Sequence, residues 1–464
     1  MKNQHNLRNV LAAALIAFCG LTLTSCRKFI QVPPPANSIV TSEIFADSTD
    51  ATAAITGIYI NMMNSAGSAD IANGLTDITS GLSADELNIT SNVASYQEFY
   101  INAITITNTN DATLWNTAYT FIYQATAVIA GATSSTTLST TLKNRLTGEA
   151  KFIRAFLNFY MVNLYGPVPL VITTDYKITG SLPRASIADI YTQINSDLKD
   201  AQALLANDPA PINKLRVNKF AVSAFTARVQ LYQQQWAAAE SAATTVINAS
   251  YKLEPNLNNV FLVGNQEEIW QMTPPAPGDE TTVGQLIIPG STTSVPTFIV
   301  TNTLLNFFEA NDQRKLKWIT SSIINNITYS YPYKYKLRRD NATTPTEAYS
   351  MLRLGEQYLI RAEARAEQNN LAGAISDINA IRTRAGLPNT TAASQADVLT
   401  AIQHERSTEL FCEWGHRWLD LKRTNNVGAV LSADKTGWKS TAALFPVPYA
   451  QTQLNPYLVQ NPGY

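Results

Sequence analysis

The stretch from Met351 to Ala385 reads MLRLGEQYLIRAEARAEQNNLAGAISDINAIRTRA and decides the fold. A second stretch, from Val217 to Ile247, shares with it a series of one small, one bulky, one small and one branched apolar residue at the same relative spacing. The two series are Ala227, Trp236, Ala239 and Val246, and Ala362, Leu371, Ala374 and Ile381. The sequence therefore contains an internal repeat.

The spacing within each copy is typical of a tetratricopeptide-type helical hairpin. Alanines at the small positions let two antiparallel helices approach closely, and the bulky residue fills the gap between them. The copies are not in tandem, because Ala239 and Ala374 are 135 positions apart. We therefore expect a predominantly all-α fold in which long insertions separate the helical hairpins, and not a simple solenoid.

A further helix is expected at Glu149–Tyr165, where the apolar residues recur on one helix face and Gly166-Pro167 predicts the end. The residues of this face are Ile153, Phe156, Leu157, Tyr160 and Leu164.

Two stretches lack helical periodicity. The main one is the insertion at about 251–346, whose Pro- and Gly-containing turns predict loops with a few short strands. The smaller one, residues 64–110, is rich in Ser, Thr, Asn and Gly. It is expected to be irregular and contains short β-branched pieces such as Ile104–Thr107.

Composition excludes several classes of protein. The 464 residues include 34 Lys and Arg against 35 Asp and Glu, so the formal net charge is −1. This balance excludes a protein that acts through bulk positive charge, and we expect no nucleic-acid partner. An apolar fraction of 45%, with only 20 Gly and 21 Pro, excludes disorder and fibrous repeats. No change in composition marks a flexible linker between domains.

The N-terminus predicts an export signal. An apolar run at Val10–Leu23 is shorter than the roughly 20 residues that span a bilayer. The following LTSC at Leu23–Cys26 resembles a bacterial lipobox, in which the cysteine is acylated and becomes the new N-terminus. We expect a signal peptide at 1–25, lipidated Cys26 and an extended spacer at 26–35. The alternatives are a transmembrane anchor and a cleaved secretory peptide with an incidental cysteine.

Processing changes the properties of the chain. Removal of residues 1–25 takes away Lys2 and Arg8, leaves 439 residues and shifts the net charge from −1 to −3. Cys412 is then the one cysteine besides Cys26, so we expect no intramolecular disulfide. Lipid chains on Cys26 would tether the protein to a membrane surface without embedding it.

The sequence offers no catalytic or metal-binding motif. After processing, the histidines are His404 and His416, and His404 lacks the second histidine one turn later that a helical zinc site needs. No Gly-x-Ser-x-Gly elbow, phosphate loop or dinucleotide-binding turn occurs. We therefore expect no catalytic residue, no metal and no cofactor, and we predict that the protein is not an enzyme.

Three glutamates form the one acidic series, at Glu405, Glu409 and Glu413. A glycosidase needs two carboxylates that flank a sugar bond. Neighbours one helix turn apart point the same way and cannot flank a bond. Because arginines alternate with these glutamates and occur on other predicted helices, structural ion pairing is the favoured interpretation.

Aromatic side chains in the polar stretches are the remaining candidates for a binding site. Tyr96, Phe99 and Tyr100 lie in the first stretch, and Trp318 and Tyr329 lie in the insertion. Such residues suit carbohydrate, because a pyranose has an apolar C–H face and a rim of hydroxyls. Core packing is the competing explanation. It is favoured for the tryptophans on predicted helices, which are Trp115, Trp236, Trp414 and Trp418.

The chain resembles SusD/RagB-type outer-membrane lipoproteins of Bacteroidetes from the lipobox to the last residue. The matching motifs are SCRKF (25–29), GEAKFIRAF (148–156), LYGPVPL (164–170), NDQRK (311–315), YPYKYK (331–336), LRLGEQYLIRAEA (352–364), IRTRAGL (381–387), RWLDLKR (417–423), FPVP (445–448) and QNPGY (460–464). One departure is Glu413-Trp414-Gly415-His416, where the family more often has Glu-Gly before Arg-Trp.

The resemblance implies a SusD-like fold over residues 36–464, with tetratricopeptide-like hairpins and a loop-rich insertion lobe. The expected parts are an N-terminal half at 36–250, the insertion at about 251–346 and a C-terminal helical part at 347–464. The implied location is the outer face of the outer membrane, by a lipid anchor. The implied function is capture of an oligosaccharide and its delivery to a TonB-dependent transporter of the SusC type.

The motifs of the family are scaffold motifs, so ligand contacts are predicted from the loops alone. The predicted contacts are Asp85, Tyr96, Tyr100 and Tyr329. Trp318 is less attractive, because it follows the family-like Asp312-x-Arg314 and is expected to be packed. Two other functions stay open. The protein could bind a peptide, as some members do, or it could be a helical-repeat scaffold that binds only protein.

Overall fold

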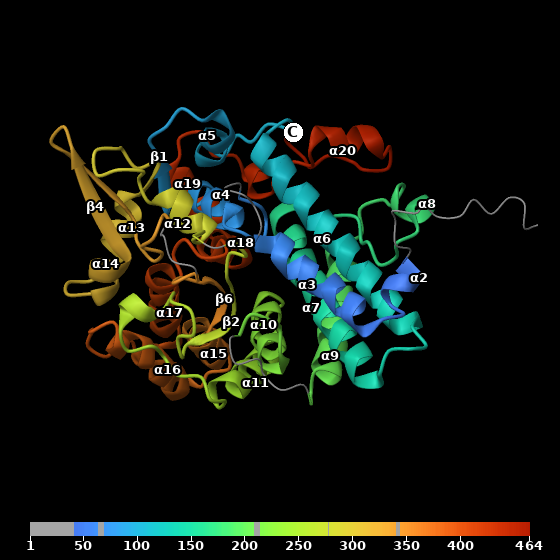
Figure 1. The fold of residues 1–464 in the computed structure, drawn as a ribbon. Helices are drawn as coiled ribbons and strands as arrows, with labels where there is room; N and C mark the ends of the chain where they lie inside the picture. The colour runs from blue at the N-terminus through green and yellow to red at the C-terminus, as the bar shows by residue number, and fades with distance from the viewer. Residues whose placement is uncertain (1–40, 64–68, 208–213, 277, 340–343) are drawn as a thin grey trace, which may run out of the picture. The chain divides into compact units, whose positions relative to one another are not determined.

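The computed structural model divides the chain into two units, residues 1–44 and residues 45–464. The structure describes residues 41–63, 69–207, 214–276, 278–339 and 344–464 (Figure 1). In the first unit the described residues include the short helix α2 (Thr41–Ile44). Every other described helix and strand belongs to the second unit. The predicted signal peptide, Cys26 and the spacer lie outside the described residues.

Long helices form the N-terminal part of the second unit (Figure 1). α7 (Thr140–Tyr165) packs against both α6 (Thr109–Ser134) and α9 (Ile187–Leu204), and α3 (Ser48–Met63) packs against α6 and α7. The Ser139 side chain caps α7 by accepting from the backbone N–H of Leu142. The helix expected at 149–165 is therefore confirmed, and it begins earlier than the apolar pattern does.

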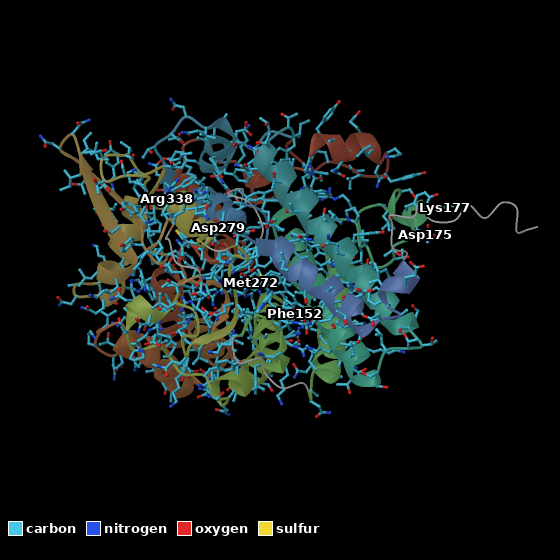
Figure 2. The ribbon with its side chains drawn as sticks, in the orientation of Figure 1. Phe152, Asp175, Lys177, Met272, Asp279 and Arg338 are labelled. Carbon is cyan, nitrogen blue, oxygen red and sulfur yellow. The ribbon has the colours of Figure 1, made fainter. Side chains whose placement is uncertain are left out.

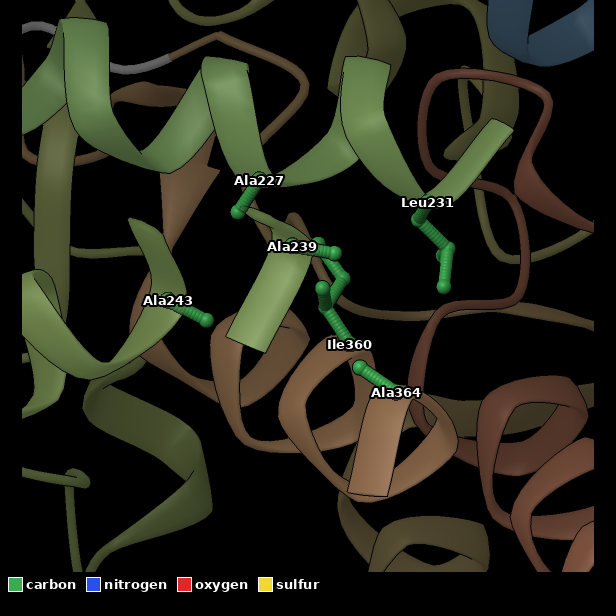
Figure 3. Packing of buried hydrophobic residues seen from close by; sticks show 6 residues of the cluster. All are labelled: Ala227, Leu231, Ala239, Ala243, Ile360 and Ala364. Atoms are coloured by element: carbon green, nitrogen blue, oxygen red, sulfur yellow. The ribbon is translucent and has the colours of Figure 1, made fainter. Parts of the chain in front are cut away.

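The two copies of the internal repeat are two neighbouring helical hairpins. α10 (Lys219–Tyr232) and α11 (Trp236–Ile247) form the first, and α15 (Leu354–Glu367) and α16 (Leu371–Arg384) form the second. Helix α11 packs directly against α15. Figure 3 shows the buried side chains between them, which are Ala227, Leu231, Ala239, Ala243, Ile360 and Ala364. The predicted hairpins are confirmed, and the insertion between them does not separate them in space.

The second hairpin continues into α17 (Gln395–Glu409) through another buried cluster. Its members are Ala362, Ala366, Ala374, Ile378, Val398 and Ile402. Small residues on α15 therefore pack against three helices: Ala364 faces α11, and Ala362 and Ala366 face α16 and α17. Only a small side chain fits where the helices approach this closely, which explains the alanines of the repeat at Ala362 and Ala374.

The repeat-bearing stretch that starts at Met351 begins inside a strand. Its first three residues, Met351–Arg353, belong to β6 (Tyr349–Arg353), and the helix α15 starts at Leu354. β6 pairs antiparallel with β2 (Glu268–Met272), with Leu352 opposite Trp270. All ten residues of this pair of strands are buried. Burial on both faces removes the alternation that would mark a strand in the sequence.

The insertion consists of short elements, as expected, but it also contains helices. In chain order these are η2 (Leu257–Asn259), β2, α12 (Thr282–Ile287), β3 (Phe298–Val300), α13 (Asn302–Phe307), α14 (Gln313–Trp318), β4 (Ile319–Ile324) and β5 (Ile327–Pro332). β4 and β5 form a hairpin closed by Asn325 and Asn326, both at positive φ, which suits the twist of a two-residue turn.

The stretch at 64–110 is more helical than its composition predicts. It contains α4 (Leu75–Ser83), β1 (Leu87–Ile89), which pairs with β3, and α5 (Ala94–Tyr100). Within it, Ile104 and Thr105 have no regular secondary structure, and Ile106 and Thr107 form a turn. Glu98 holds this turn by accepting from the backbone N–H and the hydroxyl of Thr105, each at 2.9 Å.

The C-terminal part completes the second unit with short helices. They are α18 (His416–Arg423), α19 (Val427–Asp434), η3 (Ser440–Ala443) and α20 (Tyr449–Leu454). Figure 2 shows Phe152 and Met272 in the interior, and Asp175 and Lys177 at the edge beside α8 (Tyr176–Thr179). None of the described helices combines the length and the apolar character needed to cross a membrane.

A buried ion-pair network joins the insertion to α17. Arg314 Nη1 lies 2.8 Å from Glu405 Oε2 and 3.4 Å from Glu409 Oε2, and all three side chains are fully buried. Lys334 Nζ pairs with Glu413. The structural role expected for the three glutamates is therefore confirmed, because each is matched by a buried cation from another element.

Arg353 extends the network to β6, with Nη1 2.5 Å from Glu409 Oε1 and Nε 2.7 Å from Glu413 Oε2. Burial by itself raises the pKa of Glu409, but the guanidinium groups of Arg384, Arg353 and Arg314 outweigh burial and lower the pKa below its usual range. The carboxylate therefore stays ionised in the interior.

Candidate functional site

A cavity opens at the C-terminal end of α5, where three segments of the second unit meet. Residues 100–104 form one wall, residues 434–442 form another, and Gly463 and Tyr464 complete the lining. Its volume is about 660 Å³, within the roughly 300–1,000 Å³ that is usual for small-molecule sites. Figure 1 shows α5 close to α19, which ends at this cavity.

The packing of α5 explains why Tyr100 borders the cavity. Phe99 is fully buried and meets Phe445 edge to face, with ring centroids 5.1 Å apart. This anchor fixes the rotation of the helix. The helix then stops, because Asn102 adopts a left-handed φ of 53°. Tyr100 is thereby held half-buried at the rim, while Phe99 stays in the core.

Lys435 lies behind Tyr100 and is 8% exposed. Its Nζ is 5.4 Å from the centroid of the Tyr100 ring and donates to the backbone oxygens of Leu82 and Ser83, the latter at 3.1 Å. Burial lowers the pKa of Lys435 to about 7, against smaller raising effects of Asp434 and Asp85. The ammonium group therefore loses its proton near neutral pH.

Of the four predicted ligand contacts, Tyr100 alone lines this cavity. Tyr96, one helix turn earlier, is half-buried and meets Phe298 of β3 edge to face, at 5.0 Å between ring centroids. Tyr329 lies on β5 opposite Ser322 and is half-buried. β3 contacts β5, so Tyr96 and Tyr329 belong to elements that adjoin β3.

Asp85 lies elsewhere than predicted, because it is buried rather than in an open loop. It is 1% exposed, and its two carboxylate oxygens accept from Arg417 Nε at 2.8 Å and Nη2 at 2.6 Å. Its backbone oxygen accepts from the Thr301 hydroxyl. The carboxylate is occupied by this bidentate ion pair, so the structure does not offer it to a ligand.

The tryptophans behave as core residues, as expected. Trp318 is fully buried and donates from Nε1 to the backbone oxygen of Leu257 at 2.9 Å. Trp115, Trp414 and Trp418 are buried in the same way, and Trp236 is partly buried against the first hairpin.

Glu309, His404 and Glu405 form a group whose potential ligand atoms lie within 4.8 Å of one another. Arg382 occupies it, since its Nη1 lies 2.5 Å from Glu309 Oε1 and 2.7 Å from Glu405 Oε1. Because a guanidinium already neutralises both carboxylates, we assign no metal to this group.

Sequence reasoning missed Lys435 and Asn102, which also line the cavity. Lys435 and its acceptor Ser83 are 352 positions apart. No motif or spacing connects such residues, and they meet only in the fold, where Lys435 just after α19 bonds to the end of α4.

The family-model comparison decides the identity of this fold. The model described as "SusD family" matches residues 186–464, which is more than half of the chain. The chain belongs to the SusD family. A second model, described as "Starch-binding associating with outer membrane", matches residues 28–231. The resemblance seen in the motifs is therefore confirmed.

Named relatives of this SusD-family protein match over nearly their whole length. SusD-like protein P25 of Formosa agariphila is 23% identical over 535 aligned residues, which cover 99% of each chain. SusD-like protein P2 of the same organism is 24% identical and covers 96% of this chain and 98% of the relative.

Solved structures confirm the SusD fold. A SusD superfamily protein from Bacteroides vulgatus superposes with a TM-score of 0.76 at 20% identity, covering 90% of this chain and 100% of the other. A laminarin-binding SusD-like protein superposes with a TM-score of 0.73 at 24% identity, covering 90% and 99%. At these identities the likeness establishes the fold and not the ligand.

Proposed function

We propose that this SusD-family protein captures an oligosaccharide at the cell surface and delivers it to a TonB-dependent transporter of the SusC type. The observation that carries the proposal is the cavity of about 660 Å³ beside Tyr100. An aromatic ring next to backbone and side-chain polar groups matches a sugar, which has an apolar face and a polar rim. A structural neighbour that binds laminarin supports a glycan as the ligand.

Tyr100 is the first proposed sugar contact, because it borders the cavity. Tyr96 and Tyr329 are proposed as further contacts along the surface formed by α5, β3 and β5. Asp85 is given a supporting role, because it holds Arg417 and accepts from Thr301 through its backbone oxygen, beneath this surface.

The proposed location is the outer face of the outer membrane, with Cys26 acylated and residues 26–35 as a spacer. A family model described as associating with the outer membrane supports this location. A chain with a formal net charge near zero also suits an uncharged ligand better than a polyanion. Capture and delivery require no bond to be broken, and the paired glutamates Glu405, Glu409 and Glu413 are not free to act as acid or base.

Calorimetry with the mature chain carrying Cys26→Ser tests ligand binding. The probes are laminarin oligosaccharides, maltooligosaccharides, oligogalacturonates and a mixture of short peptides. We expect binding to one neutral glycan, weakened about tenfold or more by Tyr100→Ala, the size expected for loss of a stacked aromatic contact. Tyr176→Ala is the matched control, because Tyr176 is 77% exposed on α8.

Binding of peptides alone would assign the chain to peptide capture instead. Failure to bind any probe would favour a scaffold that binds only protein. Delivery is tested separately, by asking whether the lipidated protein co-purifies with the SusC-type transporter encoded beside it and whether its deletion stops growth on the bound glycan.

A further inference from the structure

Two side chains of the cavity wall, Lys435 and Asn102, meet at the C-terminal end of α4. Lys435 Nζ donates to the backbone oxygens of Leu82 and Ser83. Asn102 Nδ2 donates to the same Ser83 oxygen at 3.0 Å. The carbonyls in the last turn of a helix lack partners within it and carry the negative end of its dipole. One helix end therefore anchors both the ammonium group and the loop that follows α5.

The Tyr100 ring is held by this anchored ammonium group. Nζ of Lys435 is 5.4 Å from the ring centroid, within the range of a cation–π contact. The hydroxyl of Tyr100 has no hydrogen-bond partner among the residues that the structure describes. The ammonium group of Lys435 is therefore the polar group that limits rotation of the Tyr100 ring about its side-chain bonds.

We infer that Lys435 is a positioning residue, which holds the Tyr100 ring in the orientation that receives a sugar. The inference rests on the proposed function and deepens it, because it names the group that orders the aromatic wall of the site. Lys435 borders the cavity but is 8% exposed, and its ammonium group is engaged by the ring and the α4 carbonyls, so we assign its effect to Tyr100. A ring fixed before binding costs less conformational entropy when the sugar docks.

The charged groups around Lys435 come from three elements. Asp434 precedes it on α19 and is exposed, and Asp85 follows α4 and is paired with Arg417. Lys439 lines the same cavity from the segment before η3 and is exposed. Asp85 is already neutralised by Arg417, so the partners left to the ammonium group are the Tyr100 ring, the two carbonyls and the exposed Asp434.

The test compares Lys435→Met, Lys435→Arg and Lys177→Met in the Cys26→Ser chain. The probe is the glycan that the wild type binds among the laminarin oligosaccharides and maltooligosaccharides. We expect Lys435→Met to weaken binding about tenfold, as for loss of a partly desolvated cation–π contact. Lys435→Arg keeps a cation that donates to carbonyls and stacks on rings, so it should restore most of the affinity. Lys177→Met is the matched control and should bind like wild type, because Lys177 is exposed on α8 and does not line the cavity.

The pH profile separates positioning from a merely structural role. Since Lys435 has a pKa of about 7, wild-type affinity should fall between about pH 6 and pH 8.5 as the cation is lost. Arginine stays charged throughout, so Lys435→Arg should bind equally well across this range. Melting temperatures of all variants, measured at each pH, check that the fold is retained.

Each result has one meaning. If the wild type binds no glycan, the proposed function fails, and this inference fails with it. If Tyr100→Ala weakens binding while Lys435→Met binds like wild type, the function stands and the positioning role is overturned. A wild-type profile that does not change with pH, or an arginine variant with the same slope as wild type, would also overturn it. Should Lys435→Met fail to fold, the comparison of wild type with Lys435→Arg decides alone.

Discussion

Arg314 and Glu405 form a fully buried ion pair, with Nη1 of the arginine 2.8 Å from Oε2 of the glutamate. Arg314 lies on α14 in the insertion and Glu405 lies on α17. This contact therefore links the insertion to the C-terminal helices. Asp312 also binds the guanidinium, at 2.8 Å from Nη2. The insertion is thus held by buried charge as well as by apolar packing.

Replacing this cation should be costly. Arg314→Met removes the cation and leaves buried carboxylates less compensated, so we expect the free energy of unfolding to fall by about 3–5 kcal/mol. Urea unfolding followed by circular dichroism measures the change. Arg339→Met is the control, because Arg339 is exposed and should change stability by less than about 0.5 kcal/mol. Equal losses in the two variants would contradict the role given to the network.

Two helical glycines should respond to alanine in opposite ways. A Cβ at Gly131 on α6 would lie 2.1 Å from Cδ2 of the buried Phe45, whereas one at Gly57 on α3 would meet no atom within 4 Å. Gly57→Ala should raise the free energy of unfolding by about 0.5–1 kcal/mol through helix propensity. Gly131→Ala should lower it by about 1–3 kcal/mol through overpacking. Thermal melts of both variants test the pair, and a stabilised Gly131→Ala would refute the close contact.

The interface between the hairpins leaves no room for larger residues. Ala239 on α11 is fully buried against α10 and α15, while the preceding Ala238 is exposed. Ala239→Leu should therefore destabilise the protein by about 1–3 kcal/mol, and Ala238→Leu should be close to neutral. Chemical denaturation of the two variants checks this, and a neutral Ala239→Leu would show that the hairpins can move apart.

Stability should depend on pH through Lys435. Its pKa is about 7 in the folded protein and 10.5 for an unperturbed lysine. Between these two pH values the unfolded chain binds more protons at Lys435 than the folded chain does. The free energy of unfolding therefore rises as pH increases from about 7 to about 10.5, and falls again as pH is lowered. Lys435→Met removes this titration. The stability advantage of wild type over the variant should grow by about 1 kcal/mol or more from about pH 7 to pH 10, and parallel profiles would contradict the burial of the amine.

Residue spacing predicted the helical hairpins because their packing rule is local. Ala227 and Ala239 sit where two helices cross, and the same is true of Ala362 and Ala374, so the pattern survives the long insertion. The buried role of the three glutamates was also predictable, because interior carboxylates need arginine partners. In contrast, Met351–Arg353 looked helical, since a strand buried on both faces has no alternating pattern.

The residues of the candidate cavity were predicted only in part, for a physical reason. Aromatic residues in a polar stretch pointed to Tyr100, which does line the cavity. The same reasoning chose Asp85, yet its partner Arg417 is 332 positions away and nothing in the local sequence reveals the pair. Lys435 was missed for the same reason. Sites assembled from distant segments depend on tertiary packing that composition does not record.

The contact of α11 with α15 also sets an order of events during synthesis and export. The face of α11 that carries Ala239 and Ala243 is finished long before Ile360 and Ala364, which cover it, have been made. Until the whole insertion has been translated, that face is covered by α10 and not yet by α15. Contacts between segments so far apart in sequence form slowly, and the exposed surface favours aggregation. The uncovered part of α11 is thus an apolar surface that only the completed α15 can bury.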